Sequence, residues 1–285
     1  MTHLRIRHET TYLYGAPVSF GEWRLRMRPA DTHGLRVSEA SLDLTPKGYT
    51  RWAFDAYGNS VCHFMPEAAS ARLQAINHLL VERFPAPLVS FSARGLSAST
   101  PIYDPATRLA LAPLITPSSD DANQTTLAWL AAHAHAEGEP ALDYVMRLSA
   151  AIHSAFKYLA RDERGTQTPT TTIQSGAGAC RDLAWLMVET LRRLGFAARF
   201  VSGYIYTGQG LVGGGATHAW CEVFVPDSGW IECDPTNGVI ESADLVRVAG
   251  TRTPQEASPM EGVVLGQAPH PQLLVDVRVT REPAD

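Results

Sequence analysis

The stretch GAGACRDLAWLMVETLRRLG, residues 176–195, decides the fold of the central part of the chain. Apolar side chains recur along it at steps of three and four residues, which predicts a helix with one apolar face: Leu183, Met187, Leu191 and Leu194. Gly195 is suited to a left-handed C-terminal cap. We therefore expect a helix that begins near Cys180 and ends before Gly195.

Cys180 then lies in the first turn of the helix, where unpaired backbone N–H groups and the positive dipole end stabilise a thiolate over a thiol. Gly176 and Gly178 keep the approach to the sulfur free of side chains. The N–H groups of the helix start are placed to hold a developing oxyanion. Two interpretations stay open at this point: a nucleophile, or a buried structural cysteine such as most free cysteines are.

Two β-rich runs downstream, 217–225 and 230–234, flank a turn cluster and predict a β-hairpin. Period-two alternation puts His218 on one face of the first strand, opposite a small apolar set suited to a core: Ala219, Cys221, Val223 and Val225. If residue 224 pairs with residue 230, His218 is a diagonal neighbour of Asp234, within side-chain reach. A slip by one residue would put the two on opposite faces.

A thiolate nucleophile needs a base, and the base needs a group that orients it. Taken singly, a histidine in a strand is more often structural, and an aspartate before Pro-Thr-Asn-Gly is often a turn residue. The order of a helix-start Cys180, a strand His218 and an Asp234 at the end of the next strand is far more specific than any one member.

Four segments together resemble the core of the bacterial transglutaminase-like family, which belongs to the papain-type thiol enzymes: 178–182 (GACRD), 198–204 (ARFVSGY), 217–220 (THAW) and 230–236 (WIECDPT). Two N-terminal segments, 25–29 (LRMRP) and 55–59 (DAYGN), are similar to the β-domain that precedes this core in bacterial proteins. The resemblance implies Cys180 as nucleophile, His218 as base and Asp234 as its orienting partner.

The chain is accordingly expected to be α+β, with an N-terminal β-sandwich-like domain and a transglutaminase/papain-like core, in which the nucleophile helix packs on an antiparallel sheet. We predict a β-rich domain at 1–90 and a proline-rich connector at 91–120, with the core at 121–250. A tail at 251–285 is expected to carry a closing strand. The connector rests on recurring prolines with few periodic segments: 85, 87, 101, 105, 113 and 117.

Bulk properties exclude several classes of function. The net charge of −5 over 285 residues argues against nucleic acid or an anionic membrane as partner. No apolar run approaches the ~18–20 residues that span a bilayer, and charges lie where a signal peptide needs an apolar block, so we expect a cytoplasmic protein. Four scattered cysteines are too few for a disulfide scaffold.

Neither a cofactor nor a metal is predicted. Residues 208–213 spell the dinucleotide fingerprint, but a strand follows where that motif needs a helix, so a mobile hairpin beside the site is the better interpretation. Zinc held by His218, Cys221 and Cys233, with Cys180 as fourth ligand, is the main chemical rival. Strand alternation opposes it, because His218 and Cys221 point to opposite faces.

The function expected is thiol-dependent acyl transfer on peptide or isopeptide amides through a Cys180 thioester. Hydrolysis by a cysteine peptidase or amidase is favoured, because water is abundant and amine transfer requires a site that excludes it. Transfer of protein glutamine to an amine, as in a transglutaminase, and a catalytically silent peptide-binding module are the alternatives. The expected partner is a peptide or protein substrate, and the sequence predicts no oligomeric state.

Overall fold

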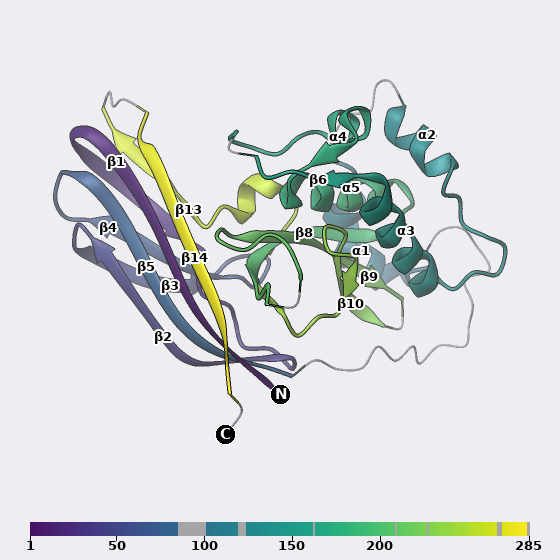
Figure 1. Cartoon of the computed structure of the whole chain (residues 1–285), viewed down its shortest axis with the longest axis horizontal. Helices are drawn as coiled ribbons and strands as arrows, with labels where there is room; N and C mark the ends of the chain where they lie inside the picture. Colours follow the sequence, from purple (N-terminus) through teal and green to yellow (C-terminus); the bar gives the residue numbers. More distant parts are fainter. Residues whose placement is uncertain are drawn as a thin grey trace.

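The computed structural model describes residues 1–84, 101–118, 124–161, 163–208, 210–226, 228–266 and 270–283. It confirms the α+β class: a strand-rich N-terminal unit precedes a core of helices packed on an antiparallel sheet (Figure 1). None of the helices in these ranges is long and apolar enough to cross a membrane.

A single long strand, β1 (Thr2–Leu25), organises the N-terminal unit. Six strands surround it: β2 (Leu35–Thr45), β3 (Gly48–Phe54), β4 (Ser60–Pro66), β5 (Ser70–Arg83), β13 (Met260–Leu265) and β14 (Gln272–Glu282). The first half of β1 lies between β5 and β14, and its second half lies between β4 and β13. Because β1 belongs to both groups, they form one antiparallel sheet whose long strands curve along their length (Figure 1).

The strand expected in the C-terminal tail is β14, and the sheet that it joins is that of the N-terminal unit. Residues 272–282 pair antiparallel with residues 3–13 of β1, so the end of the chain completes the N-terminal sheet. The two termini therefore lie close together on one unit (Figure 1). The N-terminal unit is thus assembled from both ends of the sequence.

Residues 85–100, which include Pro85, Pro87 and the first part of the expected connector, lie outside the described residues. In the part that follows, within the expected connector, the structure forms α1 (Pro105–Ile115). Proline suits the first turn of a helix, where its missing N–H has no partner to lose, and the Asp104 carboxylate accepts from the two next N–H groups. The buried side chains of Leu111 and Leu114 pack against the core sheet.

The core sheet has the order β11-β10-β9-β8-β12, formed by β8 (Ala197–Ile205), β9 (His218–Val225), β10 (Gly229–Asp234), β11 (Val239–Ile240) and β12 (Leu245–Thr251). One face is covered by α5 (Cys180–Arg193), together with α2 (Thr125–Ala131), α3 (Ala141–Ala155) and α4 (Pro169–Ser175) (Figure 1). The predicted apolar stripe of α5 and the predicted apolar face of β9 meet in one core. The other face of the sheet packs on the N-terminal unit, where Tyr204 and Val246 meet Leu4 and Ile6.

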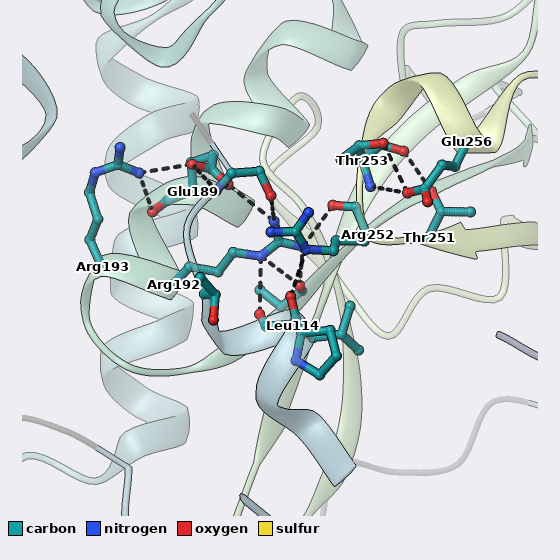
Figure 2. Close-up of polar contacts among 12 residues, drawn as sticks. Leu114, Glu189, Arg192, Arg193, Thr251, Arg252, Thr253 and Glu256 are labelled. Atoms are coloured by element: carbon teal, nitrogen blue, oxygen red, sulfur yellow. Dashed lines mark hydrogen bonds and ion pairs between the residues drawn. The ribbon is translucent and has the colours of Figure 1, made fainter. Parts of the chain in front are cut away.

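The predicted limits of the central helix are confirmed, since α5 begins at Cys180 and Gly195 adopts φ +85°. Its C-terminal turn is fixed by the fully buried Arg192, which binds the Glu189 carboxylate at 3.1 Å and the carbonyls of Leu114 and Arg252 at 3.0 and 2.8 Å (Figure 2). These bonds join α5 to α1 and to the end of β12. A buried guanidinium needs such partners, and with them it anchors the helix whose other end carries Cys180.

Candidate active site

Cys180 is the first residue of α5, and its side chain is nearly buried, at 9% exposure. The loop that precedes Cys180 contains β7 (Ala177–Gly178), which pairs in parallel with β6 (Lys157–Tyr158). This pairing fixes the position of the loop before the helix. Glycine is required at 178, because a Cβ there would lie 2.8 Å from the Cβ of Asp182. The glycine therefore lets the loop come close to the helix start.

Asp182 braces the same loop, a role that the sequence analysis did not assign. Its carboxylate accepts from the Ala179 N–H at 2.9 Å and from the Gln167 N–H at 2.8 Å. Arg161 binds both of its oxygens, at 2.8 and 3.1 Å. An acidic residue in the first turn of a helix is the available sequence signal, but its loop and arginine partners depend on the fold.

His218 and Asp234 meet as the hairpin register predicts. Residue 224 pairs with residue 230, which confirms the predicted register, and Nε2 of His218 lies 2.8 Å from Oδ2 of Asp234. Both side chains are buried, and the second carboxylate oxygen accepts from the Thr236 N–H at 2.9 Å. The first residue of β9 and the last residue of β10 thus form a buried imidazole–carboxylate pair.

The electrostatics of His218 reflect both its burial and its two neighbours. Burial lowers the pKa of the imidazole, but the Asp234 carboxylate and, to a lesser extent, the Cys180 side chain outweigh it and raise this pKa to about 10. Its other nitrogen, Nδ1, is buried and has no hydrogen-bond partner among the described residues. The imidazole is therefore tied by Nε2 to a carboxylate, while Nδ1 keeps an unused hydrogen-bonding position and Cys180 lies close enough to influence its charge.

Asn237 is a second residue, after Asp182, whose role in the site the sequence did not predict; its pattern indicated only a turn. Its side-chain amide donates to Oδ2 of Asp234 at 2.7 Å, the same oxygen that bonds His218. The Asp-Pro-Thr-Asn run is a turn signal by composition, so the contact between the two side chains could be anticipated only in outline.

The remaining cysteines of the hairpin lie elsewhere. Cys221 and Cys233 are direct cross-strand neighbours on the core face, as the predicted register requires, and burial raises the pKa of both thiols. His218 lies on the opposite face, so this set does not converge on one point. Within the described ranges no group of three or more His, Cys, Asp or Glu side chains is arranged to hold a metal. The segment 208–213 leads to β9 and not to a helix, with Gln209 outside the described residues.

Comparison with known proteins agrees with this architecture. Residues 129–235 match the transglutaminase-like superfamily, and residues 4–82 match the bacterial transglutaminase-like N-terminal region. Uncharacterized protein Rv2569c of Mycobacterium tuberculosis is 27% identical over 301 residues, covering 96% of this chain and 91% of that protein. Uncharacterized protein ML0607 of Mycobacterium leprae is 24% identical and covers 99% of each chain.

A solved structure from Cytophaga hutchinsonii, whose naming as a cysteine protease is itself provisional, superposes with a TM-score of 0.71. The two are 18% identical, and the match covers 100% of this chain and 92% of that one. At this identity the likeness establishes a shared fold over the full length. The chain thus combines a transglutaminase-like core with a bacterial transglutaminase-like N-terminal region.

Proposed function

We propose that the protein is a thiol enzyme that transfers the acyl group of a peptide or isopeptide amide to water, through a thioester on Cys180. The observation that carries the proposal is the buried His218–Asp234 pair, 2.8 Å apart, whose Nδ1 has no hydrogen-bond partner among the described residues and whose pKa the nearby Cys180 side chain helps to raise. A nucleophile at a helix start, a base and a group orienting the base are the parts that this chemistry requires.

In the proposed first step the Cys180 proton passes to Nδ1 of His218, and the thiolate attacks the amide carbonyl carbon. Asp234 holds the imidazole by Nε2 and stabilises the imidazolium that forms. The N–H groups of Asp182 and Leu183 donate to the Ala179 carbonyl, so the oxyanion is assigned to the N–H groups of the first two helix residues, Cys180 and Arg181. The C–N bond then breaks as Nδ1 returns the proton to the leaving amine, which leaves a thioester on the sulfur.

In the second step a nucleophile attacks the thioester, His218 takes its proton, and the C–S bond breaks to restore the thiolate–imidazolium pair. Water gives a carboxylic acid, as in a peptidase or amidase. A primary amine gives a new amide, as in a transglutaminase. The superfamily match supports acyl transfer in general, and we favour water because it is the more abundant acceptor.

A panel of peptide and isopeptide amides tests the proposal, with released ammonia or amine scored against incorporation of a fluorescent primary amine. Cys180→Ala is expected to abolish both products while the unfolding transition stays near that of the wild type. Cys62→Ala is the matched control, because Cys62 is a buried thiol in the N-terminal sheet, and it should keep the activity. Full activity in Cys180→Ala would refute the assignment.

The alternative, a silent binding module, predicts a different reactivity of the Cys180 thiol. Alkylation of Cys180 by iodoacetamide should then follow a free thiol with a pKa of ~8.5, and no amide in the panel should turn over. The enzyme predicts a thiolate that reacts well below that pH.

A further inference from the structure

The segment between β8 and β9 lies against the imidazole of His218. We call residues 210–215 of this segment the glycine loop. Gly213 has φ +104°, and a Cβ added to it would lie 2.4 Å from Nδ1 and 2.9 Å from Cε1 of His218. The backbone at 213 therefore lies beside the ring edge that carries the unpaired nitrogen and adds to the burial of His218, which is 1% exposed.

Asn237 clamps the glycine loop at the neighbouring residue. Its Oδ1 accepts from the Val212 N–H at 2.7 Å, and its Nδ2 donates to the Val212 carbonyl at 3.2 Å. A side-chain amide that binds both polar groups of one residue fixes that residue in position and in orientation. Because Val212 precedes Gly213, the clamp sets how the loop lies on His218.

The same Nδ2 also donates to Oδ2 of Asp234 at 2.7 Å and lies 3.5 Å from Nε2 of His218. One side chain thus contacts the loop on one side of the imidazole and the carboxylate on the other. Hydrogen bonds to a carboxylate are stronger than those between neutral groups, so Asn237 also restricts the orientation of the Asp234 carboxylate.

The glycine loop has a second attachment, in the N-terminal unit. The Val277 N–H of β14 donates to the Gly215 carbonyl at 3.1 Å. The loop is thus held at Val212 by the turn after β10 and at Gly215 by β14. Its position over His218 is set at both points.

We propose that Asn237 is a positioning residue of the thiol site: it holds the glycine loop against His218 and orients Asp234, and so fixes the imidazole that acts on Cys180. This inference rests on the proposed function, in which His218 acts on Cys180. Loss of the clamp frees the ring to turn, and the thiolate then loses the imidazolium that stabilises it.

The test is the rate at which iodoacetamide alkylates Cys180, followed by mass spectrometry between pH 4 and pH 9 on the full chain. The wild type should react with an inflection well below the free-thiol value of ~8.5. Asn237→Ala and Gly213→Ala should each move the inflection up by about one pH unit, which lowers the rate below the inflection about tenfold. The double variant should add little to the larger single effect, because both changes disturb one unit.

Two matched controls separate positioning from general loss of structure. Asn59 makes the same kind of clamp on Gly250, with 2.8 Å to its N–H and 3.0 Å to its carbonyl, and also binds a carboxylate, that of Asp55. Gly229, like Gly213, has a positive φ, of +81°, but a Cβ added to Gly229 would meet no atom within 4 Å. Asn59→Ala and Gly229→Ala should leave the alkylation profile in place even where they lower stability.

The outcomes distinguish the two proposals. A wild-type inflection near 8.5 would show that Cys180 is an ordinary thiol, and this would overturn the proposed function itself. A low wild-type inflection that Asn237→Ala leaves unmoved, in protein that unfolds cooperatively, overturns the positioning role alone. A shift in Asn59→Ala as large as that in Asn237→Ala overturns it as well, because lost stability would then account for both.

Discussion

Two histidines, His8 and His218, are both 1% exposed, yet their pKa values move in opposite directions. His8 meets only hydroxyls, with Nδ1 3.0 Å from the Tyr204 oxygen and Nε2 2.9 Å from the Thr10 oxygen. Burial among neutral partners lowers the pKa of His8 to about 4. At His218 burial acts in the same direction, but the carboxylate of Asp234 reverses it.

The hydrogen bonds of His8 also fix its tautomer. The Tyr204 hydroxyl donates its single hydrogen to the Met27 carbonyl at 2.8 Å, so it accepts from Nδ1 of His8, and Nε2 accepts from Thr10. Both nitrogens are therefore used, and the ring joins the N-terminal sheet to β8 as a neutral group. Burial among hydroxyls thus gives a neutral histidine that joins two sheets, whereas a buried carboxylate on one nitrogen gives the raised pKa of His218, the proposed base.

The largest effect expected from this comparison is on catalysis. Asp234→Asn should lower kcat/KM for the amide that the panel identifies by about three to four orders of magnitude, because an amide does not stabilise the imidazolium or keep its tautomer. The matched change His8→Gln should leave kcat/KM within about twofold. A loss smaller than tenfold in Asp234→Asn would mean that the carboxylate does not serve the imidazole as proposed.

The next effect is on stability at acid pH, and it belongs to His8. Its pKa is lower in the folded protein than the ordinary 6.5, so its contribution to the free energy of unfolding is complete above pH 6.5 and is lost as the pH falls towards 4. The loss should amount to about 3 kcal/mol. Urea unfolding at pH 7, 5.5 and 4.5 measures it.

His8→Gln should flatten this acid slope, because glutamine does not titrate. An unchanged difference between pH 7 and pH 4.5 would show that His8 is not held neutral in the folded protein. Carboxylates elsewhere titrate equally in both proteins and cancel in the comparison.

A smaller effect of opposite sign is expected from His218. Its pKa is raised in the folded protein, so its contribution to stability is complete below pH 6.5 and is lost as the pH rises towards about 10. In the wild type the proposed Cys180 thiolate releases a proton on folding while His218 takes one up, so the two changes cancel in this range. The measurement therefore uses Cys180→Ala, in which only the imidazole of the pair titrates. At about 1.4 kcal/mol per pH unit, the free energy of unfolding of Cys180→Ala should fall by about 2 kcal/mol between pH 7 and pH 8.5. Denaturant unfolding should lack this slope when Asp234→Asn is added to Cys180→Ala and should retain it when His8→Gln is added; equal slopes in all three proteins would contradict the assignment.

The sequence predicted the part of the site that follows from local patterns. The steps of three and four residues set the apolar face of α5, and Gly195 set its end. Period-two alternation predicted the faces of His218 and Asp234, and the assumed pairing of 224 with 230, which the structure confirms, brings the two side chains together. These patterns predict the elements because each helix or strand buries one face, so apolar residues recur along it at the period of that element.

Contacts between distant segments were decided by the tertiary structure alone. The pairing of β14 with β1 joins the two ends of the chain, and a strand pattern says which face is apolar but not which distant strand is its partner. The clamp of Asn237 on Val212 and the hydroxyls around His8 depend on where loops and neighbouring strands are placed. Sequence periodicity therefore determined the elements and the strand faces that carry His218 and Asp234. Only the tertiary structure decided the register that joins the two, how the imidazole is held and which buried histidine stays neutral, because these depend on where neighbouring segments are placed.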